Sequence, residues 1–467
     1  MAYDALQARP WRRLDKLDPD ALAGALIFLL TAAIFLASPV HQIADSRFSM
    51  LVSESLIQRR TFTLDHYRIP GLTPVLTHGS ASNTSIYQIE HVNGHFYHFF
   101  PPGSPVLSIP YVALLNLCGI SAAHPDGSYN QRGESIIQGS LAALLMAALA
   151  TVFFYTARLL LPLSWSVWLA LGGALGTQVW STASRALWTD TWGTFLLGLV
   201  LLSILADAAG KRRLKPIQLA TLLSWAYFVR PTYSIQIVAL TIYILIYRRQ
   251  LFLRFASTGA AWGAAFVAYS LFHYGKLLPN YYYLVNQLSF ASFPTAFAGN
   301  LISPSRGLLV YVPALGFVVY LQLRFARWNK HARLTLLALA VCAAHLLLIA
   351  GFSPWWGGHA YGPRYTTGIV PWLVLLGILG LKALFEWSGA DALEGGGRRA
   401  ATLYFGAALL ALSILINMRG ATSHAAWRWN VYPRNVDQYP ERVWDWRQPQ
   451  FLATQAEATQ GDASSQP

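Results

Sequence analysis

Residues 21–38 read ALAGALIFLLTAAIFLAS and contain no charged side chain. A helix needs about 20 apolar residues to cross about 30 Å of hydrocarbon, since each residue advances it by about 1.5 Å. Stretches of the same character recur along the chain. The candidate spans are 21–38, 136–160, 164–180, 191–208, 217–230, 233–247, 255–274, 307–323, 334–352, 366–385 and 400–417. We therefore expect an all-α polytopic membrane protein with about 11 transmembrane helices.

The composition agrees with this expectation. Of the 467 residues, 55% are hydrophobic and 12% are charged, about half the charge density of a soluble domain. These values argue against a disordered chain and against an ordinary soluble domain. The two cysteines, Cys118 and Cys342, are too few for a disulfide framework or a zinc site, and both lie in apolar runs.

The basic residues predict the orientation in the membrane, because short loops rich in Lys and Arg stay in the cytoplasm. All short basic clusters fall on one side if the N-terminus is cytoplasmic and Ser104–Ile120 does not span. That segment contains Pro105 and Pro110, so we expect it to lie at the membrane interface. The clusters are Arg9–Lys16, Arg158, Lys211–Lys215, Arg248–Arg254, Arg324–Arg333 and Arg398–Arg399. Topology and lipid contacts account for the net charge of +14, so we expect no nucleic-acid partner.

This orientation divides the chain into regions. The first span lacks a small-residue cleavage site and is interpreted as a retained anchor. The regions are a cytoplasmic segment at 1–20, a transmembrane part at 21–417, a long first outer loop at 39–135, shorter outer loops near 181–190, 275–306 and 353–365, and an outer tail at 418–467. The end of that tail, 453–467, is rich in Ala, Gln and Ser, and we expect it to be disordered.

Asp45 follows the first span directly, and Ser49–Arg60 after it has the pattern of an amphipathic helix. A carboxylate at the bilayer surface is partly desolvated, which suits a general base. The alternative is a structural pair between Asp45 and Arg47.

The first outer loop also contains the sequence Asn93-Gly94-His-Phe-Tyr97-His98, followed by Pro101-Pro-Gly-Ser-Pro105. Asn-Gly between residues of strand character predicts a hairpin. Pro-Pro-Gly then permits a helix to begin, and the N–H groups of a helix N-terminus attract phosphate. An aromatic belt with a stiff turn would explain the same residues.

Charged residues recur at the outer ends of later spans. Arg185 and Asp190 could form an ion pair or belong to a site. Arg230-Pro231 places an arginine between two short spans, where a phosphate is its natural partner, although a snorkelling arginine is the alternative. Lys276 adds a further cation to the loop near 275–306.

The fifth outer element is Trp355-Trp356-Gly-Gly-His359-Ala-Tyr361-Gly-Pro-Arg364-Tyr365. An aromatic belt explains the tryptophans but not the glycines and the Gly-Pro-Arg sequence around them. Its glycines and proline predict a tight loop that approaches a ligand closely. The aromatic faces suit a sugar, and Arg364 suits a phosphate.

In this order, the motifs resemble the GT-C superfamily of membrane glycosyltransferases over about residues 20–420. The matching parts are Asp45 with Leu64-Asp65, the block from Tyr97 to Pro105, Arg230-Pro231, and the loop from Trp356 to Tyr365. The likeness extends to bacterial mannosyl-, arabinosyl- and protein O-glycosyltransferases. Such enzymes use polyprenyl-phosphate sugars at the outer face.

The resemblance implies roles for particular residues. Asp45 would be the catalytic base. Arg364 and Arg230 would hold the donor phosphate, and we add Lys276 and Arg185 as further candidates because they are cations of the outer loops. Residues for the substrates would be His98, Tyr97, His359, Tyr361, Trp356 and Asp190. The family often has two adjacent acids in the first loop, whereas Ser46 and Arg47 follow Asp45 here. We therefore expect no dedicated metal site, with a divalent cation left open.

The expected activity is inverting transfer of a sugar from a polyprenyl-phosphate donor to a hydroxyl acceptor on a glycan, lipid or protein. The expected place is the periplasmic face of a bacterial inner membrane, among membrane lipids. A lipid-linked glycan transporter, or flippase, and an oligosaccharide polymerase are the alternatives.

Overall fold

The computed structural model describes residues 18–73, 84–283, 288–390 and 395–455. The predicted basic N-terminal cluster and most of the predicted disordered end lie outside these residues. Within them the protein is all-α apart from one two-stranded hairpin. The elements are α1 (Pro19–Ala37), α2 (Ser49–Arg59), β1 (Ile89–Val92), β2 (His95–His98), α3 (Gly103–Leu117), α4 (Gln131–Arg158), α5 (Leu163–Leu175), α6 (Thr189–Ala208), α7 (Pro216–Val229), α8 (Ser234–Tyr247), α9 (Arg249–Tyr274), α10 (Phe293–Ile302), α11 (Leu308–Tyr311), α12 (Ala314–Arg324), α13 (Ala332–Ala350), α14 (Val370–Ala390), α15 (Gly395–Thr422) and α16 (His424–Arg428).

The described part of the chain contains seven helices long and apolar enough to cross a membrane, which makes this a multi-pass membrane protein. These seven candidate spans are Pro19–Ala37, Gln131–Arg158, Thr189–Ala208, Arg249–Tyr274, Ala332–Ala350, Arg364–Ser388 and Gly397–Thr422. The other four predicted spans correspond to shorter apolar helices, α5, α7, α8 and α12. The predicted span 307–323 is interrupted, because Pro313 has no N–H to continue the hydrogen bonds of α11 into α12.

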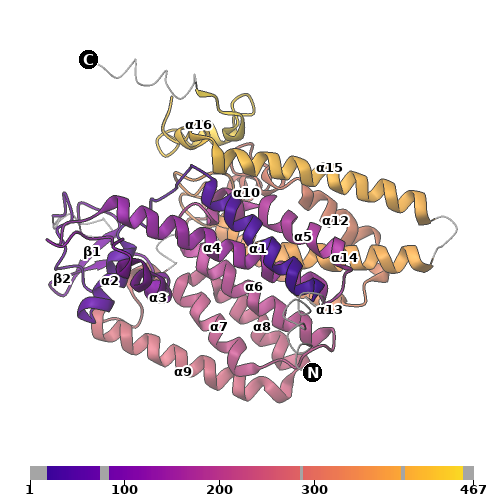
Figure 1. Ribbon diagram of the computed structural model, residues 1–467, viewed down its shortest axis with the longest axis horizontal. Coiled ribbons are helices and arrows are strands. Elements are labelled where there is room, and N and C mark those ends of the chain that lie inside the picture. The colour runs from indigo at the N-terminus through magenta and orange to yellow at the C-terminus, as the bar shows by residue number, and fades with distance from the viewer. Residues whose placement is uncertain (1–17, 74–83, 284–287, 391–394, 456–467) are drawn as a thin grey trace, which may run out of the picture.

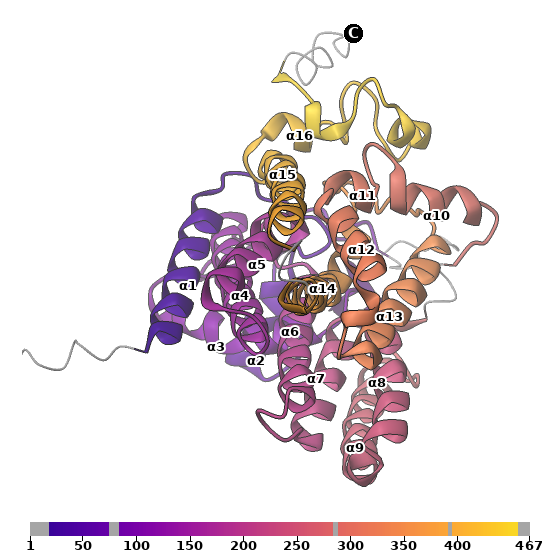
Figure 2. The same ribbon diagram turned by 90° about the vertical axis from the view of Figure 1, so that its right-hand side faces the viewer.

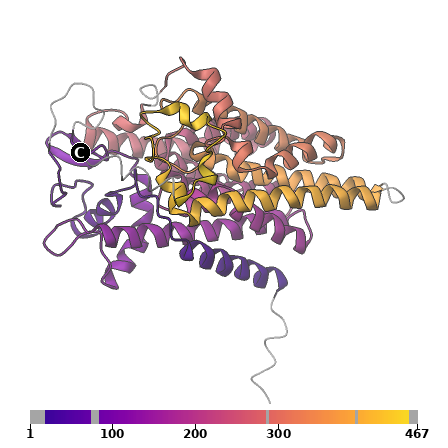
Figure 3. The same ribbon diagram turned by 90° about the horizontal axis from the view of Figure 1, so that it is seen from above.

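Helix α14 forms the centre of the bundle, as the end-on view in Figure 2 shows. In its most apolar stretch 78% of the residues are buried, against 28% in α1, 11% in α9 and 22% in α15. Figure 2 shows α1 and α9 at edges of the bundle, and Figure 3 shows α1 along one side. These helices are apolar on their exposed faces, as lipid contact requires.

The elements of the first outer loop gather at one end of the bundle, on the left of Figure 1. The predicted hairpin is confirmed: β1 and β2 pair antiparallel, with Glu90 opposite Tyr97. Asn93 and Gly94 have φ angles of 52° and 82°, the left-handed values that a tight two-residue turn needs. The predicted helix at Ser49–Arg60 is confirmed as α2, and α3 begins at Gly103 within the Pro-Pro-Gly block.

Gly103 brings the start of α3 against the end of α7. A Cβ atom at this position would lie 2.5 Å from the backbone of Phe228, so a larger residue would push the two helices apart. The contact places the Pro-Pro-Gly block beside Arg230, which follows α7 directly. Two motifs that are far apart in the sequence therefore meet at the same end of the bundle.

Candidate functional site

Asp45 is held in a short turn between α1 and α2. Glu134 fixes that turn, because its carboxylate accepts the backbone N–H groups of Phe48, at 2.9 Å, and Met50, at 3.0 Å. On the other side, Arg185 donates to the carbonyl oxygens of Phe35 and Ser38 at the end of α1. Arg185 is thus a buried cap of α1, each of its three nitrogens donates one hydrogen bond, and the structure does not place it on the phosphate side of the candidate site.

Asp45 forms an ion pair with Arg364, not with Arg47. The Oδ2 atom of Asp45 accepts from Arg364, and the Oδ1 atom accepts from the Tyr87 hydroxyl at 3.2 Å. The guanidinium of Arg364 lies over the ring of Trp188, with 3.7 Å from Cζ to the ring centroid. Asp45 and Arg364 are 319 positions apart in the sequence, so only the fold brings the predicted base and the predicted phosphate ligand together.

A second ion pair joins Arg230 to Asp190, the first-turn acid of α6. The two side chains are 5% and 2% exposed, so this pair is buried. Arg230 also donates to the Thr232 hydroxyl at 3.2 Å, and its guanidinium lies 5.8 Å from the ring centroid of Tyr365. Tyr365 follows Arg364, and this ring therefore links the two pairs.

His98 also belongs to this site, since it lines a small cavity together with Asp45 and Arg364. Tyr97 precedes His98 in β2, and its hydroxyl lies 3.5 Å from His273 Nδ1 on α9. Lys276 is exposed and donates to Asn280 at 2.8 Å. Tyr97 therefore contacts α9, and Lys276 contacts another residue of the loop after α9.

The Trp356–Tyr365 loop is fastened to the C-terminal tail. Trp356 Nε1 donates to Asp437 at 2.9 Å, and His359 Nε2 lies 3.1 Å from Asn435 Oδ1. Buried Arg306 donates to the carbonyl oxygen of Trp356 at 2.8 Å and to tail residues.

Tyr361 is 1% exposed, and its hydroxyl donates to the Ile416 carbonyl oxygen. The structure thus gives Trp356, His359 and Tyr361 contacts that shape the loop and present Arg364.

Sequence reasoning missed Tyr87 and Trp188, which contact Asp45 and Arg364. An exposed tyrosine in a loop and a tryptophan at a span end are ordinary features of membrane proteins, and no local pattern singled them out.

The residues around Asp45 do not fit a divalent cation. A guanidinium and a phenol occupy its two oxygens, whereas Mg²⁺ and Ca²⁺ need several oxygen ligands. In the described ranges, no group of three or more His, Cys, Asp or Glu side chains is placed to hold a metal ion.

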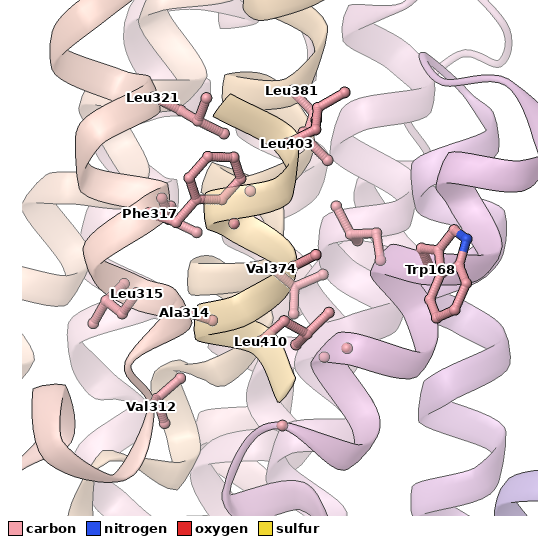
Figure 4. A pocket seen from close by; sticks show the side chains of 18 of the residues that line it. Trp168, Val312, Ala314, Leu315, Phe317, Leu321, Val374, Leu381, Leu403 and Leu410 are labelled. Atoms are coloured by element: carbon pink, nitrogen blue, oxygen red, sulfur yellow. The ribbon is translucent and has the colours of Figure 1, made fainter. Parts of the chain in front are cut away.

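A large apolar cavity of about 590 Å³ runs between α5, α12, α14 and α15. Figure 4 shows Trp168, Phe317, Val374, Leu403 and Leu410 around it. Thr177 lines it, and the adjacent Gln178 donates to the Thr366 hydroxyl at 3.2 Å, two residues beyond Arg364. One wall of the cavity is therefore hydrogen-bonded, through Gln178, to the segment that begins at Arg364.

Glu90 links the hairpin to the loop after α9. It is 1% exposed, its Oε2 atom accepts from Asn280 Nδ2 at 2.7 Å, and its Oε1 atom has no partner in the described residues. Burial raises the pKa of this carboxyl from its ordinary 4.5 to about 7, against the lowering effect of Asn280 and Lys276. Tyr281, which follows Asn280 in the chain, packs on Phe100 with 5.3 Å between the ring centroids. Phe100 lines the small cavity that Asp45 also lines.

Replacement of Glu90 by Gln is expected to stabilise the protein at pH 8 and to have little effect at pH 5. The folded protein keeps a proton on Glu90 that the unfolded chain loses between pH 4.5 and about 7, so wild-type stability falls across this window. At about 1.4 kcal/mol per pKa unit, the loss is on the order of 3 kcal/mol. Thermal melting of wild type and Glu90→Gln at pH 5 and pH 8 measures this loss of stability.

The difference in stability between wild type and Glu90→Gln at each pH isolates the contribution of Glu90 from that of other titratable groups. His98 acts in the opposite direction, because burial lowers its pKa to about 4 and stability then falls on acidification below its ordinary 6.5. A Glu90→Gln effect of equal size at both pH values would contradict the assignment.

Comparison with known proteins adds no further identification. No protein-family model matches the chain, and no curated protein matches it.

Proposed function

We propose that this protein is an inverting membrane glycosyltransferase that uses a polyprenyl-phosphate sugar as donor. The observation that carries the proposal is the pairing of Asp45 with Arg364 beside the buried pair of Arg230 and Asp190. Four charged side chains from distant parts of the chain meet at the end of the bundle covered by the first outer loop. An acid and two arginines at one apolar–polar boundary suit a substrate that has a hydroxyl, a phosphate and a lipid tail.

In this reaction the acceptor hydroxyl attacks the anomeric carbon of the donor sugar. Asp45 takes the hydroxyl proton, the bond from the anomeric carbon to the phosphate oxygen breaks, and polyprenyl phosphate leaves. Attack from the face opposite the leaving phosphate inverts the anomeric configuration. Arg364 and Arg230 stabilise the charge on the phosphate, and Asp190 holds Arg230 in position.

The donor phosphate competes with Asp45 for Arg364. When the phosphate takes over the guanidinium, the Oδ2 atom of Asp45 becomes available for the acceptor proton. The apolar cavity between α5, α12, α14 and α15 provides a place for part of the lipid tail. Its walls are almost entirely apolar, and Gln178, next to lining residue Thr177, donates to Thr366 in the segment that begins at Arg364.

The proposal includes eleven membrane crossings, with the four shorter apolar helices as spans inside the bundle. The first outer loop and the C-terminal tail then face the periplasm of a bacterial inner membrane. Glycan, lipid and protein hydroxyls are all within reach of a site on that face.

A mass assay tests the proposed activity. Purified protein in lipid nanodiscs is given a panel of polyprenyl-phosphate sugars and hydroxyl-bearing acceptors. We expect one acceptor to gain the mass of a sugar residue while an equal amount of polyprenyl phosphate appears. The Asp45→Asn variant serves as the matched control. Donor binding without any sugar transfer across the panel would contradict the proposal and favour a lipid-linked glycan transporter.

A further inference from the structure

A second, much smaller cavity lies beside the Asp45–Arg364 pair. Its volume is about 10 Å³, which is the space of one water molecule. Three helices begin at its wall: α2 contributes Ser49, α3 contributes Ser104 and α6 contributes Thr189. The first turns of three helices, whose N-termini carry partial positive charge, therefore border the same small space.

Several of the residues that line the cavity have buried polar atoms that lack partners. The hydroxyl oxygens of Ser46, Ser49 and Ser104 have no hydrogen bond in the described residues, although these side chains are only 3–6% exposed. The same is true of Trp188 Nε1 and Arg364 Nε. Buried polar atoms without partners are costly and rare, so their concentration at one cavity indicates a missing partner molecule.

His98 adds a hydrogen-bond acceptor to this wall. Its Nε2 atom lies 3.1 Å from the carbonyl oxygen of Arg47, and a carbonyl only accepts, so Nε2 carries the ring proton. Burial lowers the pKa of His98 to about 4, so the ring is neutral at pH 7. With the proton on Nε2, the Nδ1 atom carries a lone pair, and no described residue donates to it.

This mixture of donors and acceptors selects the kind of occupant. A cation would face the N–H groups of Trp188 and Arg364, and an anion would face the Asp45 carboxylate and the His98 lone pair. A neutral oxygen that both donates and accepts satisfies every group. A phosphate or a sugar ring is too large for the cavity, whereas a single water or hydroxyl oxygen fits.

We propose that this cavity seats the attacking oxygen of the reaction, which is the acceptor hydroxyl during transfer and a water molecule when no acceptor is present. A water there donates one hydrogen to Asp45 and the other to His98, and it accepts from the serine and indole groups. An acceptor hydroxyl donates to Asp45, and one of the serine hydroxyls turns to donate to His98.

A further activity follows, and it rests on the proposed function. Without an acceptor, the protein hydrolyses its donor: the water oxygen bonds to the anomeric carbon, its proton passes to Asp45, and the bond to the phosphate oxygen breaks. The products are the free sugar and polyprenyl phosphate. Ser46, Ser49, Ser104 and His98 act as positioning residues for the water.

The test measures polyprenyl phosphate released from the identified donor in ¹⁸O-labelled water without acceptor. We expect slow release of phosphate that contains no ¹⁸O, because the oxygen from water goes to the sugar. In Ser104→Thr, the added methyl group fills the space of the water, and we expect release to fall at least about tenfold. Release at the wild-type rate in this variant, or no release by the wild type, would overturn the proposal.

Thermal melting of two alanine variants provides a readout independent of activity. The Ser108 hydroxyl, one turn along α3, donates to the Ser104 carbonyl oxygen at 2.7 Å, so Ser108→Ala is the matched control for a partnered hydroxyl. If a water occupies the cavity, Ser104→Ala lowers the melting temperature as Ser108→Ala does. If the cavity is empty, Ser104→Ala removes an unsatisfied hydroxyl and raises the melting temperature, which would contradict the proposal.

Failure of the water site and failure of the proposed function give different results. A wild type that transfers sugar to an acceptor but never hydrolyses the donor would retain the proposed function and overturn the water site. A wild type that performs neither reaction with any donor would overturn the proposed function, and the water site with it.

Discussion

Replacement of Asp45 by Asn is expected to reduce sugar transfer by about 100-fold to 10,000-fold, the range that a general base contributes. The amide keeps the size of the side chain and its contact with Tyr87 but cannot take a proton from the acceptor. Donor binding is expected to persist, because Arg364 then has no carboxylate to compete with the phosphate. Initial rates with saturating donor and acceptor measure the loss.

A matched variant separates this effect from general damage to the loop. Asp126 lies in the same outer loop, and its contacts are hydrogen bonds from Ser128 and an exposed pair with Arg68. Asp126→Asn should transfer sugar at close to the wild-type rate. If Asp45→Asn retained wild-type activity, Asp45 would not be the base.

Replacement of Arg230 by Met is expected to have the largest effect on stability. The change leaves Asp190 as a buried charge without its partner, since both side chains are at most 5% exposed. Loss of one member of a buried pair costs about 3–5 kcal/mol. The melting temperature in nanodiscs measures this loss.

The double variant Arg230→Met, Asp190→Leu is expected to regain most of the stability. Removing both charges also removes the cost of burying them, and the two apolar side chains fill similar space. If Arg230 holds the donor phosphate, the double variant folds but requires a much higher donor concentration. A double variant as unstable as Arg230→Met would show that charge pairing is not the cause, and one with unchanged donor affinity would remove Arg230 from the phosphate site.

Local features of the sequence predicted much of the first outer loop correctly. Asn93-Gly94 predicted the hairpin because few residues other than Asn and Gly tolerate the positive φ angles of its turn. Pro-Pro-Gly predicted the start of α3, and the spacing of apolar residues predicted α2. Each of these predictions depends on residues within about one turn or hairpin of each other, so no tertiary information is needed.

Interactions between distant residues were the part that the sequence did not reveal. Asp190 has Arg185 nearby in the chain, yet its partner is Arg230, and Arg185 instead caps α1. Asp45 has Arg47 two residues away, yet its partner is Arg364. In both cases helix direction and burial decide which guanidinium faces the carboxylate, and neighbours in the sequence need not point the same way.

The sequence by itself determined that this is a multi-pass membrane protein. Hydrocarbon tolerates only helices whose side chains are apolar and whose backbone is internally hydrogen-bonded, and that constraint can be read directly from residues such as 21–38. It also identified Asp45, Arg230 and Arg364 as candidates. Only the tertiary structure decided which of them meet, and it alone formed a water-sized cavity among Ser46, Ser104 and their neighbours. Burial of polar groups is a property of three-dimensional packing, and no short stretch of sequence encodes it.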